Sequence, residues 1–213
     1  MVVEQIQNAP IYSAIILLSF IVGTIYYFYL ERKNDPYLKC IVFVIAGTFS
    51  VIASTLLCAL FSLVFNDKMS GYRSIFSIFY TLFTFPVFGF LLQKIFKLKV
   101  DFDSYLKPII VTIFIARIAC LYQGCCNKYG LVYIEMAILL TVYILTLVIK
   151  KSNFFGFLLT YSIFRFIADF FKETFYYEQI GVLSMMQYMG FILICVCIVV
   201  IVTSKKIPNE EKL

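Results

Sequence analysis

Histidine and tryptophan are both absent from the 213 residues, and charged residues make up only 14% of the chain. Without histidine the chain lacks the usual general base near neutral pH and the commonest metal ligand. A soluble domain carries about 25% charged residues. The scarcity of charge, combined with 62% hydrophobic residues, therefore argues against a soluble fold and favours a membrane protein.

Long apolar runs are plentiful, and short polar connectors separate them. A helix needs about 20 apolar residues to cross the hydrocarbon core of a bilayer. Seven runs approach this length, and the fourth and sixth are the shortest: residues 11–30, 40–65, 74–92, 106–122, 131–149, 154–171 and 182–203. The predicted fold class is an all-α integral membrane protein, in which residues 1–213 form a single seven-helix transmembrane domain.

The basic residues lie mostly on one side of these spans. Of the 18 lysines and arginines, twelve lie in or at the edges of the connectors after the first, third and fifth spans, or in the tail. Four lie in the connectors after the second, fourth and sixth spans. Because the basic side faces the cytoplasm, we expect the N-terminus outside and the C-terminus inside. An odd number of spans requires the same arrangement, and we read the net charge of +6 as loop topology.

Four ionisable residues lie well inside the predicted spans: Arg117, Glu135, Arg165 and Asp169. Each such residue costs about 2.5–3.5 kcal/mol at the centre of a helix on insertion scales, so an intramembrane charge is a functional hypothesis by default. With the predicted orientation, all four fall at a similar depth in the outer half of the bilayer. The shared depth predicts one polar site rather than four separate ones.

Helical spacing places polar and small residues on two helix faces: Arg117, Cys120 and Gly124 on one, and Tyr161, Arg165, Asp169 and Lys172 on the other. Two interpretations are open. The charges could form two ion pairs that only hold helices together, Arg165 with Asp169 and Arg117 with Glu135. Alternatively, the arginines could bind an anionic headgroup, since guanidinium binds phosphate in a bidentate way and keeps its proton.

A cysteine group follows the first arginine, at Cys120, Cys125 and Cys126. A zinc site is disfavoured because no histidine is available and the other cysteines are distant in sequence. A disulfide between Cys120 and one of the other two, a nucleophilic cysteine, and simple packing of small residues remain open. We favour packing, with Gly124 allowing close backbone approach.

Five sequence elements occur in a familiar order: DFDSYLKP (101–108), RIACLYQGCCNKYG (117–130), YIE (133–135), YSIFRFIADFFKE (161–173) and LSMMQY (183–188). The second resembles the Arg-Ile-Gly-Cys/Asn…Gly-Cys-Cys-Tyr-Gly signature of prolipoprotein diacylglyceryl transferases. The others are similar to that family's Asp…Pro, Tyr-Glu, Tyr…Arg-Phe-x-x-Glu-Phe and Leu-Ser…Gln elements. The resemblance covers roughly residues 101–190.

The resemblance implies a reaction and a location. Such enzymes move the diacylglyceryl group of phosphatidylglycerol to the lipobox cysteine thiol of an exported lipoprotein precursor, in the bacterial cytoplasmic membrane. They need no metal or nucleotide, and they act at the outer leaflet. The implied catalytic residues are Arg117, Arg165, Asp169 and Glu135, and the implied substrate-binding set is Arg117, Cys120, Gly124, Tyr161 and Arg165. The implied partners are phosphatidylglycerol and the lipoprotein precursor.

The chain differs from the family in three ways. The family's His-Gly-Gly element has no counterpart in residues 71–83, which read GYRSIFSIFYTLF, and Asn127-Lys128 extends the loop after the cysteine pair. The outer connectors are also too short for the external head and arms that fuller family members present to the precursor protein, so we expect a simpler or different recognition of the acceptor. A membrane protein that binds a lipid or a partner on the same scaffold without catalysis is therefore the alternative. A transporter or channel is a third interpretation, which the off-centre position of the charges disfavours.

Overall fold

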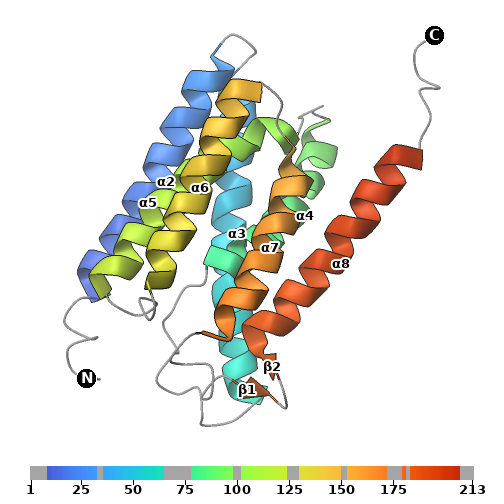
Figure 1. Cartoon of the computed structure of the whole chain (residues 1–213). Coiled ribbons are helices and arrows are strands. Elements are labelled where there is room, and N and C mark those ends of the chain that lie inside the picture. The colour runs from blue at the N-terminus through green and yellow to red at the C-terminus, as the bar shows by residue number, and fades with distance from the viewer. Residues whose placement is uncertain are drawn as a thin grey trace.

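The computed structural model describes residues 9–32, 36–64, 78–97, 102–123, 130–149, 153–171, 179–180 and 183–206. Nearly all of these residues are helical, in α-helices labelled α2 to α8 (Figure 1). Their bounds are α2 (Ala9–Glu31), α3 (Pro36–Val64), α4 (Ile78–Phe96), α5 (Leu106–Gln123), α6 (Leu131–Ile149), α7 (Phe154–Asp169) and α8 (Met185–Lys206). A 3-10 turn, η2 (Phe102–Tyr105), leads into α5, and a small antiparallel pair, β1 (Gln179–Ile180) and β2 (Leu183–Ser184), precedes α8.

Each predicted span has a helix at its position in the structure. Four helical stretches are long and apolar enough to cross a membrane: Ile11–Glu31, Tyr37–Leu57, Phe102–Tyr122 and Leu131–Ile149. In α4 and α8 the apolar stretches are shorter, at Thr84–Phe96 and Gln187–Thr203. The structure thus supports a helical protein with four candidate membrane helices in its described part, whereas seven crossings stay a prediction.

The prediction for the start of the last span is wrong. We expected residues 182–203 to be one helix, but Leu183 and Ser184 form strand β2, and α8 begins at Met185. Ser184 pairs with Gln179 and Leu183 pairs with Ile180. Backbone pairing with the preceding segment has therefore replaced the first helical turn. The predicted start of the third span, at 74–77, lies outside the described residues.

The helices are apolar on their outward as well as their inward faces, which is typical of helices surrounded by lipid. Large side chains such as Leu17, Leu140 and Val199 are more than two-fifths exposed. Hydroxyl groups inside the bundle donate to carbonyls of their own helix, as Ser50 does to Ala46 and Ser162 does to Leu158, both at 2.6 Å. These bonds satisfy the buried hydroxyl groups without water.

The helices associate largely in pairs. Helix α2 packs mainly against α5, α3 against α4, and α7 against α8, while α6 lies on α5. Figure 1 shows α2, α5 and α6 together on one side of the bundle and α8 at the opposite edge. Fewer contacts join α2 to α3, so a seam separates the α2/α5 pair from the α3/α4 pair.

Gly23 allows α2 and α5 to approach closely. A Cβ atom at this position would lie 1.9 Å from Oγ1 of Thr112 and 3.3 Å from the carbonyl oxygen of Pro108. Thr112 Oγ1 donates to that same carbonyl at 2.8 Å, which fixes the hydroxyl in place. Close helix approach at small residues is a common basis of helix association in membranes.

We expect Gly23→Ala to destabilise the protein by about 1–3 kcal/mol, because the new methyl group overpacks the interface. Thermal unfolding in detergent, followed with a thiol-reactive dye that detects the buried Cys40 and Cys197, would measure the change. Removing the obstructing hydroxyl in a Gly23→Ala/Thr112→Ala double variant should restore part of the loss. Equal melting temperatures for Gly23→Ala and the wild type would contradict the close contact.

Aromatic rings fill the centre of the bundle. The rings of Tyr27, Phe43, Phe85 and Tyr105, here called the aromatic cluster, lie 4.9 to 5.6 Å apart in five pairs. Such pairs add about 0.5–1.5 kcal/mol each beyond the burial of their area. The cluster joins α2, α3, α4 and η2 at one level of the bundle.

The turn η2 also fixes the start of α7. The backbone N–H of Phe154 donates to Oδ1 of Asp103 at 2.6 Å, and Asn153 caps the same helix by accepting from the N–H of Gly156 at 2.8 Å. Two side-chain acceptors thus satisfy N–H groups that a helix start leaves without partners. Asp103 therefore couples the start of α5 to the helix that carries Tyr161 and Arg165.

Candidate functional site

Glu135 of α6 is the centre of a buried charge cluster. Its Oε1 lies 2.8 Å from Nε of Arg117 on α5, and its Oε2 accepts from Nη1 of Arg165 on α7 at 3.1 Å. The hydroxyl of Tyr161 also donates to Oε1 of Glu135. Three helices therefore meet at one carboxylate, which is only 2% exposed.

Arg117 is held by the protein along its whole guanidinium group. Besides the ion pair with Glu135, its Nη2 donates to the hydroxyl oxygen of Tyr161 at 3.0 Å, and its Nη1 lies 3.5 Å from Sγ of Cys120. The residue is 4% exposed. Its neighbours thus fix both the position and the plane of this charge.

Arg165 is more accessible than Arg117. Its side chain is 10% exposed, twice the value for the side chain of Arg117. It extends from α7 one turn beyond Tyr161 and contacts Oε2 of Glu135, whereas Arg117 contacts Oε1. Of the two arginines, Arg165 is the one that an approaching ligand can meet more easily.

Asp169 is the last residue of α7 and is buried, at 1% exposure. It lies one helical turn beyond Arg165. Nearby, the amide nitrogen of Gln187 on α8 donates to the carbonyl oxygen of Phe166 at 3.2 Å, which ties the start of α8 to the end of α7. The end of α7 is therefore a fixed part of the bundle.

The two predicted helix faces converge. Arg117 and Cys120 on α5 and Tyr161 and Arg165 on α7 meet around Glu135, in agreement with their helical spacing. Gly124, Cys125, Cys126 and Lys172 lie outside the described residues. Cys120 carries a reduced, buried thiol that packs with Tyr12, Ala119 and Val132. This packing agrees with its interpretation as a small core residue.

One carboxylate joins both arginines, which the structural alternative drawn from the sequence did not include. That alternative placed Arg117 on Glu135 and Arg165 on Asp169, as two separate pairs. Arg117 does bind Glu135, and Arg165 binds the same carboxylate. Tyr161 and Arg165 therefore lie on the side of α7 that faces Glu135. Formally, Arg117, Arg165 and Glu135 together carry one net positive charge, which the buried Asp169, one turn beyond Arg165, balances.

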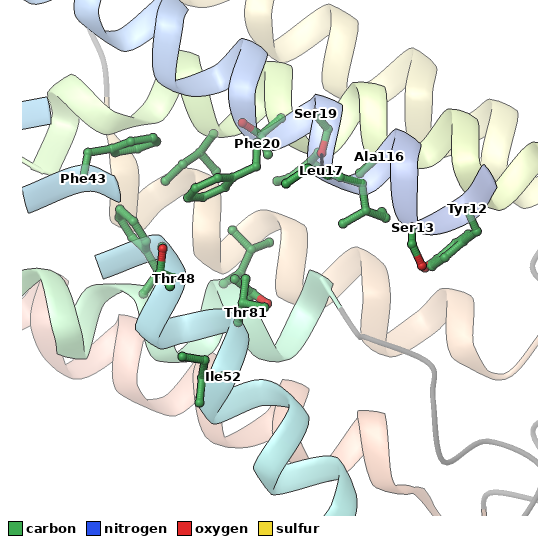
Figure 2. A pocket seen from close by; sticks show the side chains of 18 residues that line it. Tyr12, Ser13, Leu17, Ser19, Phe20, Phe43, Thr48, Ile52, Thr81 and Ala116 are labelled. Carbon is green, nitrogen blue, oxygen red and sulfur yellow. Dashed lines mark hydrogen bonds between the residues drawn. The ribbon is translucent and has the colours of Figure 1, made fainter. Parts of the chain in front are cut away.

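A cavity of about 400 Å³ lies in the seam between the α2/α5 and α3/α4 pairs, and 18 residues line it. Figure 2 shows Tyr12 and Ser13 at one end of the cavity and Phe43 at the other. Ala116, which directly precedes Arg117, is also part of the lining. The sequence did not predict this cavity. The only local signal was the set of small or hydroxyl-bearing residues on the facing helices: Ser13, Ser19, Gly47 and Thr48.

Metal ligands do not gather anywhere in the described part of the chain, where no group of three or more Cys, Asp or Glu residues lies close enough to hold an ion. The charge cluster itself presents guanidinium, carboxylate, phenol and thiol groups. Searches against family profiles, curated proteins and solved structures found no match to this chain.

Proposed function

We propose that this protein transfers the diacylglyceryl group of phosphatidylglycerol to a cysteine thiol of an exported lipoprotein precursor. The observation that carries the proposal is the pair of buried arginines, from two different helices, that share the single carboxylate of Glu135. Two fixed guanidinium groups in a low-dielectric environment form a good site for a phosphate group, because electrostatic attraction is stronger there than in water. The order of sequence elements around these residues supports the same activity.

The reaction is a displacement at carbon. The precursor's thiolate attacks the carbon of the diacylated glycerol that bears the phosphate ester. An S–C bond forms there, and the bond between that carbon and the phosphate oxygen breaks. The electron pair of the broken bond leaves with the oxygen, which gives glycerol phosphate. The departing oxygen gains negative charge, and a fixed guanidinium beside it stabilises that charge without reorganisation during the reaction.

The geometry suggests different roles for the two arginines. Arg165 is the more accessible, so we assign it the direct contact with the phosphate. Arg117 is fully enclosed by Glu135, Tyr161 and Cys120, so we assign it a positioning role: it holds Glu135 and Tyr161 and adds positive field.

We assign the proton of the attacking thiol to a carboxylate, because the chain has no histidine. Glu135 is already engaged by ion pairs with two guanidinium groups and by a hydrogen bond from a phenol. We therefore assign proton removal to Asp169, the other buried carboxylate among the described residues, one turn beyond Arg165. Thiolate is the reactive form of cysteine, so this proton transfer is required.

The proposed setting is the bacterial cytoplasmic membrane, crossed seven times. The uneven distribution of lysine and arginine supports an external N-terminus and a cytoplasmic C-terminus. In this orientation the charge cluster faces the outer leaflet, where phosphatidylglycerol and a translocated precursor could both reach it.

The transfer is tested with purified protein, labelled phosphatidylglycerol and a lipobox peptide. We expect lipidated peptide with the wild type, and a loss of about 100-fold or more with Arg117→Ala, since such positioned charges contribute on this scale. Lys94→Ala, at the end of α4, is the matched control because it removes a positive charge remote in sequence from the cluster and should leave the rate unchanged. No lipidated peptide above the Arg117→Ala level would contradict the proposal for that acceptor.

The alternative is a lipid-binding protein without catalysis, which the missing His-Gly-Gly element favours. Binding of phosphatidylglycerol to protein in phosphatidylcholine nanodiscs separates the two. The alternative would be supported if the wild type binds phosphatidylglycerol but forms no lipidated peptide, and if Arg165→Ala loses this binding.

A further inference from the structure

The cavity in the helix seam has an almost wholly hydrocarbon character. Its lining contains no charged residue. Hydroxyl groups of the lining are directed to the backbone: Ser19 donates to the carbonyl oxygen of Ile16, Thr48 to that of Val44 and Thr112 to that of Pro108, at 2.7 to 2.8 Å. These groups therefore have little to offer a polar ligand.

The two ends of the cavity differ. At one end Phe43 and Phe85 belong to the aromatic cluster, where the fully buried Tyr27 and Tyr105 pack behind them. The rings therefore close this end with well-packed side chains that cannot easily move apart.

The other end adjoins residues that neighbour the charge cluster, although no residue of that cluster lines the cavity. Ala116 precedes Arg117 in α5, and Tyr12 packs against Cys120, whose sulfur lies 3.5 Å from Nη1 of Arg117. The cavity is elongated, with Tyr12 and Ser13 at one end and Phe43 at the other (Figure 2). The first end adjoins residues that neighbour Arg117, and aromatic rings close the second. An occupant with an anionic head and an apolar tail matches this gradient.

We propose that this cavity binds one acyl chain of an anionic membrane lipid, and that Phe43 and Phe85 limit the length of the chain it accepts. The inference rests on the proposed function, since the chain belongs to the lipid whose headgroup the arginines hold. A large apolar cavity excludes water, and inside a bilayer the available apolar molecules are lipid chains. We place the entry of the chain between α2 and α3, which make fewer contacts with each other than α2 makes with α5 or α3 with α4.

Photolabelling tests the site without requiring catalysis. The protein is placed in phosphatidylcholine nanodiscs with lysophosphatidylglycerols that differ only in acyl length and carry a diazirine at the chain end. We expect cross-links to Leu82, Phe85 or Phe43 with one preferred length. Labels confined to lipid-facing residues such as Phe90, which is 61% exposed, would overturn the proposal.

Two variants change the volume of the cavity in opposite directions. Val51→Phe adds volume inside the cavity and should shift the preferred chain to a shorter one, whereas Phe85→Leu removes ring volume and should shift it to a longer one. Leu56→Phe and Phe90→Leu are controls on the same two helices at exposed positions, where the preference should not change. If Phe85→Leu fails to fold, Val51→Phe alone decides, and an unchanged preference there contradicts the length limit.

A headgroup comparison identifies the lipid. Lysophosphatidylcholine of the preferred length should label the cavity several-fold less than lysophosphatidylglycerol, because the arginines favour a net negative head. Equal labelling by both would contradict the anionic lipid as occupant. Cavity labelling in a protein that transfers no lipid to peptide would count against the proposed function alone, and transfer without cavity labelling would count against this inference alone.

Discussion

Replacing Glu135 by glutamine is expected to cause the largest loss of stability of any single change at the charge cluster. Glutamine keeps the shape of the side chain but removes the negative charge that Arg117 and Arg165 share. Two guanidinium groups would then face each other in the bundle without a common counterion. Removing one partner of a buried ion pair costs about 3–5 kcal/mol, and we expect a loss in this range.

A second ion pair in the same protein provides the control. Glu31 accepts from Nζ of Lys39 at 2.7 Å, and its side chain and that of Lys39 are 14% and 23% exposed. This is a one-to-one pair with better access to solvent, so Glu31→Gln should cost about 1 kcal/mol or less. Thermal unfolding with the thiol-reactive dye measures both variants, and equal losses would contradict the central role of Glu135.

A double variant tests the pairing itself. If Arg165 is stabilised mainly by Glu135, the double variant Glu135→Gln/Arg165→Gln should lose less free energy of unfolding than the two single variants lose together. We expect the difference to be about 0.5–3 kcal/mol. Simple addition of the two losses would mean that the contact seen at 3.1 Å contributes little.

Replacing Arg165 by lysine is expected to cause the largest selective loss of activity. Lysine keeps the positive charge but presents a single ammonium group in place of the planar guanidinium fork. Contact with both Glu135 and a phosphate group is then difficult to maintain. We expect the transfer rate to fall by about 100-fold or more, the size of effect seen when one positioned donor is removed from an active site.

The stability of Arg165→Lys separates chemistry from folding. Arg165→Lys retains the charge balance at Glu135. The melting temperature of Arg165→Lys should therefore differ from that of the wild type much less than the melting temperature of Glu135→Gln does. Lys39→Arg, at the more accessible pair with Glu31, is the matched control for an exchange between the two basic residues. Full activity of Arg165→Lys would rule out bidentate phosphate binding by this residue.

The sequence predicted the helices well because their signal is local. Long apolar runs between polar connectors marked the positions of α2, α3, α5 and α6 to within a few residues. The strand pair before α8 was missed, since two residues are too few to show an alternating pattern and Leu183 continues an apolar segment.

Part of the charge cluster was predictable from the sequence, but its shared carboxylate was not. Intramembrane charges are rare, so Arg117, Glu135 and Arg165 stood out from the sequence alone. Spacing along α7 indicated that Arg165 could pair with Asp169, but spacing says nothing about how α7 is rotated toward α6, so it did not predict that Arg165 also binds Glu135. The packing of Phe154, Phe157 and Leu158, which are all buried on α7, contributes to that rotation.

The cavity could not be predicted because its lining and the lipid-facing surface have the same composition. Ile113 lines the cavity and Ile118 of the same helix is 43% exposed, yet nothing in the sequence separates them. The difference arises only when two helix pairs pack without closing the seam between them.

Release of glycerol phosphate is the most direct test of the proposed reaction. Protein in nanodiscs that contain phosphatidylglycerol is incubated with a lipobox peptide, and with the same peptide in which serine replaces the cysteine. We expect one glycerol phosphate for each lipidated cysteine peptide and none above background with the serine peptide. Release that is absent, or equal with both peptides, would contradict transfer to a thiol as the activity of this protein.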